Sequence, residues 1–346
     1  MLEAKPPLLI RGHHGMGDCL HQRAVVRQLM QRHDVWLETS WPCIYDDLIA
    51  EGLKVLGKRT SLRTQTKNAN RPSEIAKFSH SLPPPNTRSI QMAYAVREIQ
   101  STPSKTVLEA MCVRAGCDFA TADFRLPIPP EWITPQISTI NGSGKPLMVY
   151  RPLTKRPEWS GGNARNADPA QYAELLAEVR DTFFIVSVAD LVPSREWIDG
   201  PQLKADVTFH EGELVFEQLA ALFSQADLIF ASSGFAAVLG PAVETPTVSI
   251  IGGYEPIECH DAGARFAPYL AIGPVHRPDK HFDMPTAKDR LRKFLSPICI
   301  QISDKPAPEI AAVFIPEGPV QQPALSAQQL QLQRAMYRKR TAAGKA

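Results

Sequence analysis

Short apolar runs alternate with amphipathic stretches along most of this chain. The run Pro7–Gly12 is followed by a glycine-containing loop, an amphipathic stretch over Cys19–Arg32 and a second apolar run at Val35–Thr39. Apolar runs of a few residues are typical of buried strands, and apolar positions spaced three or four apart are typical of helices. The segment therefore predicts a strand, loop, helix and strand in the order of a βαβ unit.

The rest of the first half predicts further helices, and then the pattern breaks. Helical spacing is found at Tyr45–Leu56, Ser89–Ile99 and Thr106–Ala115. Prolines then gather after residue 126, and glycines follow them at 142 and 144. Because proline and glycine do not suit the interior of an element, we expect a domain boundary within residues 127–146.

The α/β alternation restarts in the second half. Strands are predicted at four apolar runs, which are Pro146–Tyr150, Phe183–Val188, Asp227–Ala231 and Pro246–Ile251. Helices are predicted between them, at 168–179, 215–223 and 235–243, the first with Asp168 as N-cap before Pro169. These strands lack polar alternation, which indicates a parallel sheet buried on both faces. We expect two doubly wound α/β domains, residues 1–140 and 146–302, whose facing strand ends line a cleft.

Composition narrows the class of protein. The chain has 346 residues, which fits two domains, and its 31 prolines mark boundaries in a folded protein. Lysines and arginines number 38 against 36 aspartates and glutamates, a balance that argues against a dominant nucleic-acid-binding surface. The six cysteines form no CxxC pair and indicate reduced thiols. Without a signal peptide or a membrane-spanning apolar run, the protein is expected to be cytoplasmic.

The loop after the first predicted strand holds the first candidate site. Gly15 and Gly17 allow a tight turn and a close approach of the backbone to a ligand. Asp18 follows at the start of the helix, where a carboxylate serves either as a helix cap or as a general base for an acceptor hydroxyl. His13 and His14 flank this position. We expect these two histidines and the two glycines to contact the acceptor.

Two later strand ends carry candidate donor-binding residues. The loop Arg151–Arg165 contains Thr154, Lys155 and Arg165, and its cations suit a diphosphate unless the loop is merely solvated. The turn Ser232-Ser233-Gly234 opens a helix and offers hydroxyls and backbone donors to phosphate or sugar, or simple N-capping. Asp190, after another strand, is placed to bind ribose hydroxyls or to lie in a surface loop.

Three segments together resemble the ADP-heptose:lipopolysaccharide heptosyltransferase family. They are Gly15–Asp18, Arg165–Leu176 and the stretch from Phe216 through Ser232-Ser233-Gly234 to Val248. The resemblance implies the GT-B fold, with two Rossmann-like domains facing across a cleft, Asp18 as catalytic base and Arg165 on the donor diphosphate. The chain departs from the family pattern at Ser232 and Ala237, where the family has aspartate and histidine. It also has Ala167 in place of the usual tryptophan. The loss of these side chains predicts either a change in which donor sugar fits or weaker binding of the donor.

The resulting functional prediction is an inverting glycosyltransferase that moves sugar from a nucleotide-diphosphate sugar to an acceptor hydroxyl. A lipopolysaccharide or polysaccharide acceptor is favoured, and contact with a membrane surface is compatible with the absence of a spanning segment. The chain has no Asp-x-Asp motif, so neither a metal nor another cofactor is expected. Two alternatives stay open: transfer to DNA or another anionic polymer through the basic end of the Pro-rich segment 303–346, and a non-catalytic nucleotide- or sugar-binding protein.

Overall fold

The computed structural model describes residues 4–58, 71–156, 166–274 and 281–303. These residues all belong to the first of two compact units, which ends at Val313. Arg165 and the basic tail lie outside the described residues, and so does the DNA-binding alternative that depends on the tail. Among the described helices, none combines the length and the apolar character that crossing a bilayer requires.

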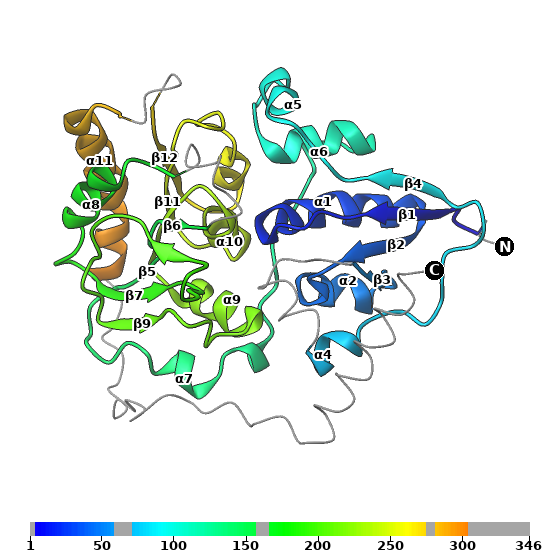
Figure 1. The fold of residues 1–346 in the computed structure, drawn as a ribbon, viewed down its shortest axis with the longest axis horizontal. Coiled ribbons are helices and arrows are strands. Elements are labelled where there is room, and N and C mark those ends of the chain that lie inside the picture. Colours follow the sequence, from blue (N-terminus) through cyan, green and yellow to red (C-terminus); the bar gives the residue numbers. More distant parts are fainter. Residues whose placement is uncertain (1–3, 59–70, 157–165, 275–280, 304–346) are drawn as a thin grey trace. The chain divides into compact units, whose positions relative to one another are not determined.

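The first half of the chain forms a four-stranded parallel sheet in the order β3-β2-β1-β4 (Figure 1). Its strands are β1 (Pro7–Arg11), β2 (Asp34–Thr39), β3 (Lys54–Gly57) and β4 (Arg88–Gln91). Helix α1 (Met16–Arg32) connects β1 to β2, which confirms the predicted strand, loop, helix and strand. The helix begins earlier than expected, so Asp18 lies inside its first turn.

Two of the predicted helices in this half are wrong. In the segment 45–56 the helix α2 is short (Asp46–Ala50), and Gly52, with a φ of 107°, turns the chain into β3. The segment 89–99 begins with β4, and helix α5 (Val96–Ser101) follows it. Both β3 and β4 are edge strands with partly exposed side chains, so neither shows the apolar run of a central strand.

The third predicted helix of this half is confirmed as α6 (Val107–Ala115). Thr106 caps it by accepting a hydrogen bond from the Glu109 backbone at 3.2 Å, and Gly116 ends it in the left-handed conformation. The remaining short elements before residue 140 are η1 (Pro42–Tyr45), α4 (Pro72–Ile75), η2 (Pro130–Trp132) and α7 (Pro135–Ser138).

The second half forms a six-stranded parallel sheet in the order β12-β11-β10-β5-β7-β9. Its strands are β5 (Leu147–Tyr150), β7 (Phe184–Val188), β9 (Val207–Phe209), β10 (Leu228–Ser232), β11 (Thr247–Ile250) and β12 (Tyr269–Ile272). The four strands that the apolar runs predict are confirmed and are the central ones. The two edge strands, β9 and β12, lack a prediction. A small antiparallel pair, β6 (Thr154–Lys155) with β8 (Trp197–Ile198), lies outside this sheet.

The helices of this half are α8 (Pro169–Ala177), α9 (Phe216–Gln225), α10 (Phe235–Ala242), the short η4 (Asp261–Arg265) and α11 (Met284–Ser303). The predicted cap of α8 is confirmed, because Asp168 accepts hydrogen bonds from the backbone of Ala170 and Gln171, each at 3.0 Å. Helix α11 is unpredicted. It lies beside α8, where Lys288 and Arg292 form ion pairs with Glu178.

Strand order places the binding regions of both sheets. In the larger sheet the chain runs outward from β5 through β7 to β9, then returns beside β5 and runs outward from β10 to β12. This is the Rossmann strand order, in which ligands bind where the direction reverses, at the carboxyl ends of the strands. The smaller sheet has the same arrangement around β1 and β4. The loops after β1, β4, β5 and β10 are therefore the places to look for a site.

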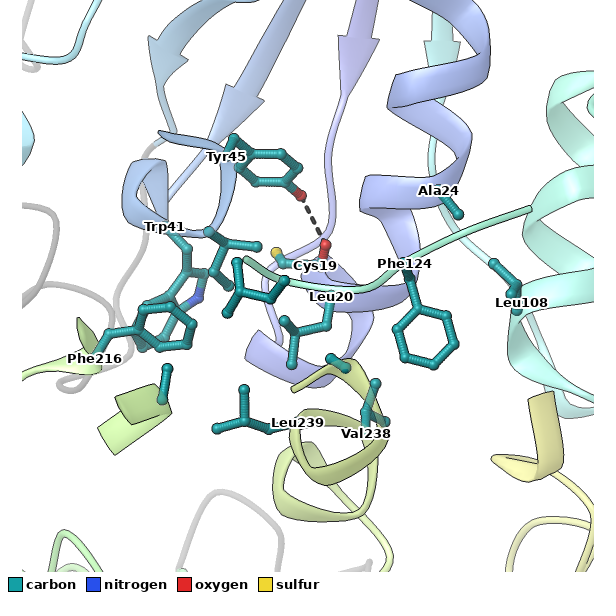
Figure 2. Packing of buried hydrophobic residues seen from close by; sticks show 14 of the residues in the cluster. Cys19, Leu20, Ala24, Trp41, Tyr45, Leu108, Phe124, Phe216, Val238 and Leu239 are labelled. Carbon is teal, nitrogen blue, oxygen red and sulfur yellow. Dashed lines mark hydrogen bonds between the residues drawn. The ribbon is translucent and has the colours of Figure 1, made fainter. Parts of the chain in front are cut away.

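Helices α1 and α10 pack together and share one hydrophobic core (Figure 2). Leu20 of α1 lies against Val238 and Leu239 of α10, and Phe216 at the start of α9 belongs to the same cluster. The N-terminal turns of α1 and α10 follow β1 and β10. This packing consequently fixes two of the four loops against each other.

Candidate active site

The loops after β1 and β4 bring three side chains together around Asp18. The Tyr94 hydroxyl donates a hydrogen bond to Asp18 Oδ1 at 2.5 Å, and His13 Nδ1 lies 3.5 Å from Asp18 Oδ2. The rings of His13 and Tyr94 also contact each other, with centroids 5.1 Å apart. We call Asp18, His13 and Tyr94 the Asp18 cluster. Each carboxylate oxygen thus has its own side-chain partner.

The two glycines of the loop are explained by close contacts. A Cβ atom at Gly15 would lie 2.5 Å from Asp18 Oδ2, so a side chain there would displace the carboxylate. A Cβ atom at Gly17 would lie 3.1 Å from the Cα atom of Phe235, the first residue of α10. Ordinary carbon contacts are about 3.5–4.0 Å. Gly15 therefore makes room for the carboxylate, and Gly17 for the start of α10.

The two histidines of the loop differ in their surroundings. Burial lowers the pKa of His13, nearby Lys58 and Arg114 lower it further, and Asp18 opposes the shift. His13 is consequently neutral at neutral pH and can hydrogen-bond to an incoming hydroxyl or to Asp18. Burial, Lys58 and His13 also lower the pKa of His14, whose side chain is exposed. The His14 carbonyl accepts a hydrogen bond from Trp41 Nε1 at 3.0 Å, which orders the loop.

The alternative role of Asp18 as a helix cap gains no support from the geometry. Gly15 is the N-cap of α1, and the described residues include no side-chain hydrogen bond that caps this end. The carboxylate still benefits from the positive end of the helix dipole, which favours an anion in the first turn. Asp18 is therefore a carboxylate held by side chains in the first turn of α1, an arrangement that suits a general base.

Arg151 is the first residue after β5 and lies beside the start of α10. Its guanidinium carbon lies 4.5 Å from the centre of the Phe235 ring. Burial lowers the pKa of Arg151, and the carboxylates of Glu196 and Asp190 oppose that shift. Since an arginine stays charged in proteins, this is a partly buried cation at the switch point of the larger sheet.

Two further cations of this loop are engaged by carboxylates. Lys155 forms an ion pair with Asp199 at 2.7 Å, and Arg156 forms one with Glu196 at 2.7 Å. Thr154 is buried in β6, and its carbonyl accepts a hydrogen bond from Asn166 at 3.0 Å. Lys155 can therefore reach a diphosphate only by loosening its pair with Asp199.

Asp190 lies just beyond β7, on the side of the sheet where Arg151 is found. It forms an isolated antiparallel bridge with Glu211, and its charge contributes to the pKa of Arg151. A carboxylate near the carboxyl end of the second strand is where Rossmann-like sheets bind ribose hydroxyls. The position fits the predicted role, which stays a prediction.

The turn between β10 and α10 combines a buried hydrogen bond with an open helix end. Ser232 ends β10, and the Ser233 hydroxyl donates to Glu255 at 2.7 Å and lies 3.3 Å from His260 Nε2. Gly234 has a φ of 140°, which only glycine adopts readily. A Cβ atom there would meet no atom within 4 Å, so the backbone at the start of α10 is open to an anion.

A short series of contacts joins the two switch points. Asp18 neighbours Gly17 in the chain, Gly17 lies against Phe235, and the Phe235 ring lies under Arg151. The candidate base thus lies close to a cation and to the N-terminus of a helix. This combination can deprotonate a hydroxyl on one side and stabilise a departing anion on the other.

The sequence interpretation missed several partners in this region. Tyr94 is absent from it because residues 89–99 were expected to be helical, whereas Tyr94 follows the end of β4. Glu196, Glu255 and His260 are far along the chain from the groups they contact. A correct assignment of β4 would have placed Tyr94 at a strand end, but no local pattern indicates the other three.

Solved structures share this fold. One is the dodecameric iron-containing heptosyltransferase TibC from enterotoxigenic E. coli H10407, determined in complex with ADP-D-beta-D-heptose. It has a TM-score of 0.54 and 13% identity over 87% of this chain and 78% of TibC. Another is the glycosyl transferase family 9 protein from Veillonella parvula, with a TM-score of 0.50 and 9% identity over 87% of this chain and 99% of that one. No family model and no curated protein matches the sequence. The predicted GT-B fold is confirmed.

Proposed function

We propose that this chain is an inverting, metal-independent glycosyltransferase that uses a nucleotide-diphosphate sugar as donor. One observation carries the proposal: Asp18, held by Tyr94 and His13, follows Gly17, which lies against Phe235 at the start of α10, and the Phe235 ring in turn contacts Arg151. The fold shared with TibC, whose structure contains a nucleotide sugar, supports the choice of donor class. Both the proposed enzyme class and the proposed donor class depend on finding a candidate base beside a candidate anion site, which is formed by Arg151 and the start of α10.

The proposed reaction uses Asp18 on the acceptor side of the site and the anion-binding groups on the donor side. Asp18 takes the proton of the acceptor hydroxyl, and the oxygen attacks the anomeric carbon on the face opposite the diphosphate. The bond between that carbon and the diphosphate oxygen breaks, and its electron pair leaves with the nucleoside diphosphate. Arg151 and the backbone N–H groups at the start of α10 stabilise the charge that develops on the leaving group.

The remaining predicted residues have supporting roles in this proposal. Lys155 and Arg165 add to the charge that faces the diphosphate, and Asp190 binds the ribose. Ser232, Ser233 and Gly234 line the donor side, while His13, His14, Gly15 and Gly17 line the acceptor side. We propose a glycan acceptor of lipopolysaccharide or polysaccharide type, because the loop before the base also carries the imidazoles of His13 and His14, which can hydrogen-bond to sugar hydroxyls.

The isosteric variant Asp18→Asn tests the base. A general base contributes roughly 100- to 10,000-fold to a rate, so transfer should fall by about that factor while the affinity for nucleoside diphosphate stays unchanged. Asp118→Asn, at an exposed carboxylate in the same half of the chain, is the matched control and should keep full activity. Released nucleoside diphosphate measures the rate with a panel of nucleotide sugars, and calorimetry measures the affinity.

Three results would contradict parts of the proposal. Full turnover in Asp18→Asn would remove Asp18 from the chemistry. A product with the donor's anomeric configuration, read by NMR, would exclude single-step inversion. A rate that depends on added Mg²⁺ or Mn²⁺ would exclude the metal-independent mechanism. Nucleotide binding without turnover across the donor panel would indicate a non-catalytic binding protein on this fold.

A further inference from the structure

A buried group of metal-ligating side chains lies in the segment between β11 and β12. Glu255, Cys259 and His260 each direct one donor atom to a common region, and these three atoms lie within 4.8 Å of one another. The residues are 8%, 0% and 7% exposed. In tetrahedral metal sites with bonds of about 2.0–2.3 Å, donor atoms are roughly 3.3–3.8 Å apart. Small side-chain rotations would bring the three donors to that spacing.

A fourth donor is available whichever nitrogen of His260 binds an ion. His21 Nε2, from α1, lies 3.5 Å from His260 Nδ1, and Ser233 Oγ lies 3.3 Å from His260 Nε2. The His21 and His260 rings are stacked, with centroids 5.8 Å apart. His21 is itself buried, at 1% exposed. The distances, the burial and the donor types of these residues therefore all favour a metal site here.

Charge favours a dication at this place. A thiolate at Cys259 and a carboxylate at Glu255 carry two negative charges in a buried region, and a divalent ion neutralises both. Sulfur, imidazole and carboxylate together are the donors that Zn²⁺ and similar transition-metal ions take, whereas Mg²⁺ and Ca²⁺ prefer oxygen alone.

A second cluster of similar residue types contains ion pairs. The donor atoms of Cys43, Glu74 and Glu217 also lie within 4.8 Å of one another. There the carboxylates already have cations, because Lys77 lies 2.7 Å from Glu74 and Arg71 lies 3.0 Å from Glu217. Its negative charge is therefore balanced by protein groups.

We propose that Glu255, Cys259 and His260 bind one divalent transition-metal ion of the Zn²⁺ class, with His21 or Ser233 as fourth ligand. Binding replaces the thiol proton of Cys259, which is released to solvent, so the affinity rises with pH. The ion is structural. The backbone N–H of Val107, at the start of α6, donates a hydrogen bond to the Cys259 carbonyl at 3.0 Å. The ion would join α1, α6 and the turn before α10.

Binding of Co²⁺ to the full chain tests the proposal. A thiolate-to-cobalt charge-transfer band in the near ultraviolet should grow to one equivalent and disappear when Zn²⁺ is added. The variant Cys259→Ser should lose the band, whereas the matched control Cys43→Ser, another buried cysteine, should keep it. The variant His260→Gln should weaken Co²⁺ binding at least tenfold. Circular dichroism establishes that each variant is folded.

The outcomes separate the proposal from a purely hydrogen-bonded cluster. No band in the folded wild-type protein, or a band that survives Cys259→Ser, overturns the proposal. If Cys259→Ser does not fold, His260→Gln decides the question, because undiminished Co²⁺ affinity in that variant also overturns it. One equivalent of zinc in protein purified without chelators, lost in either variant, would support it independently.

Discussion

Replacing Arg23 by methionine should destabilise the protein by about 3 kcal/mol. Arg23 lies on α1, is 1% exposed and makes two hydrogen bonds to Asp47, at 2.8 and 2.7 Å. It also donates to the carbonyl of Ile44 and, at 3.0 Å, to that of Arg125. A paired charge contributes about 1.5–3 kcal/mol and each carbonyl bond about 1 kcal/mol. Methionine fills much of the volume, and Asp47 keeps a second cation, so the lower part of the range of about 3–5 kcal/mol applies.

Urea unfolding followed by circular dichroism measures this difference in the free energy of unfolding. The matched control is Arg27→Met, because Arg27 contacts the same carboxylate, at 3.0 Å, from a side chain that is 32% exposed. Exposed pairs contribute at most about 1 kcal/mol, so the control should lose less than that. Equal losses in the two variants would show that burial of Arg23 does not determine its contribution.

The pH dependence gives a second check on the same pair. Burial alone would raise the pKa of Asp47, but the hydrogen bonds and charges of Arg23 and Arg27 outweigh it and hold this pKa below its ordinary value. A lowered carboxyl pKa stabilises the fold fully above the unfolded pKa of about 4, and the stabilisation is lost as pH falls through the folded value. The gap between wild type and Arg23→Met should stay constant from pH 8 to 5 and narrow below about pH 4. A gap that persists unchanged at pH 3 refutes the reasoning.

Two further predictions concern the proposed reaction. Tyr94→Phe removes the side-chain hydrogen bond that positions the Asp18 carboxylate, which should lower kcat about tenfold. An unchanged kcat in this variant would show that Tyr94 does not act through Asp18. Arg151→Met should weaken nucleoside diphosphate binding by about tenfold or more, as titration calorimetry would measure, and unchanged affinity would place the diphosphate elsewhere.

The central strands of the fold were predictable, and the edge strands were not. Strands β5, β7, β10 and β11 are almost wholly buried because both faces are covered, and their apolar runs are visible in the sequence. Strand β4 is mostly exposed, so its residues resemble a surface helix as much as a strand. Its pairing with β1 decides the matter, and such a pairing depends on residues far apart in the sequence.

The same limit explains which site residues were found. Asp18 is recognisable because glycines and a helix start surround it within a few positions. Tyr94 became visible only with the strand order, which places the loops after β1 and β4 side by side. Strand order, once known, accounts for Arg151 and Ser233 in the same way, since they follow the two strands at the switch point of the larger sheet.

The sequence of the loop Arg151–Arg165 does not show which of its cations are paired with carboxylates. Composition suggested a cationic loop, yet Lys155 and Arg156 each have a carboxylate partner in the structure, and Arg151 lies in the field of Glu196 and Asp190. Near-balanced charge attracts a diphosphate weakly unless another positive source is present. The open start of α10 supplies it, because a Cβ atom at Gly234 would meet no atom within 4 Å and the positive end of the helix dipole favours an anion there. Donor affinity should therefore depend more on this helix end and on Arg151 than on the number of cations in the loop.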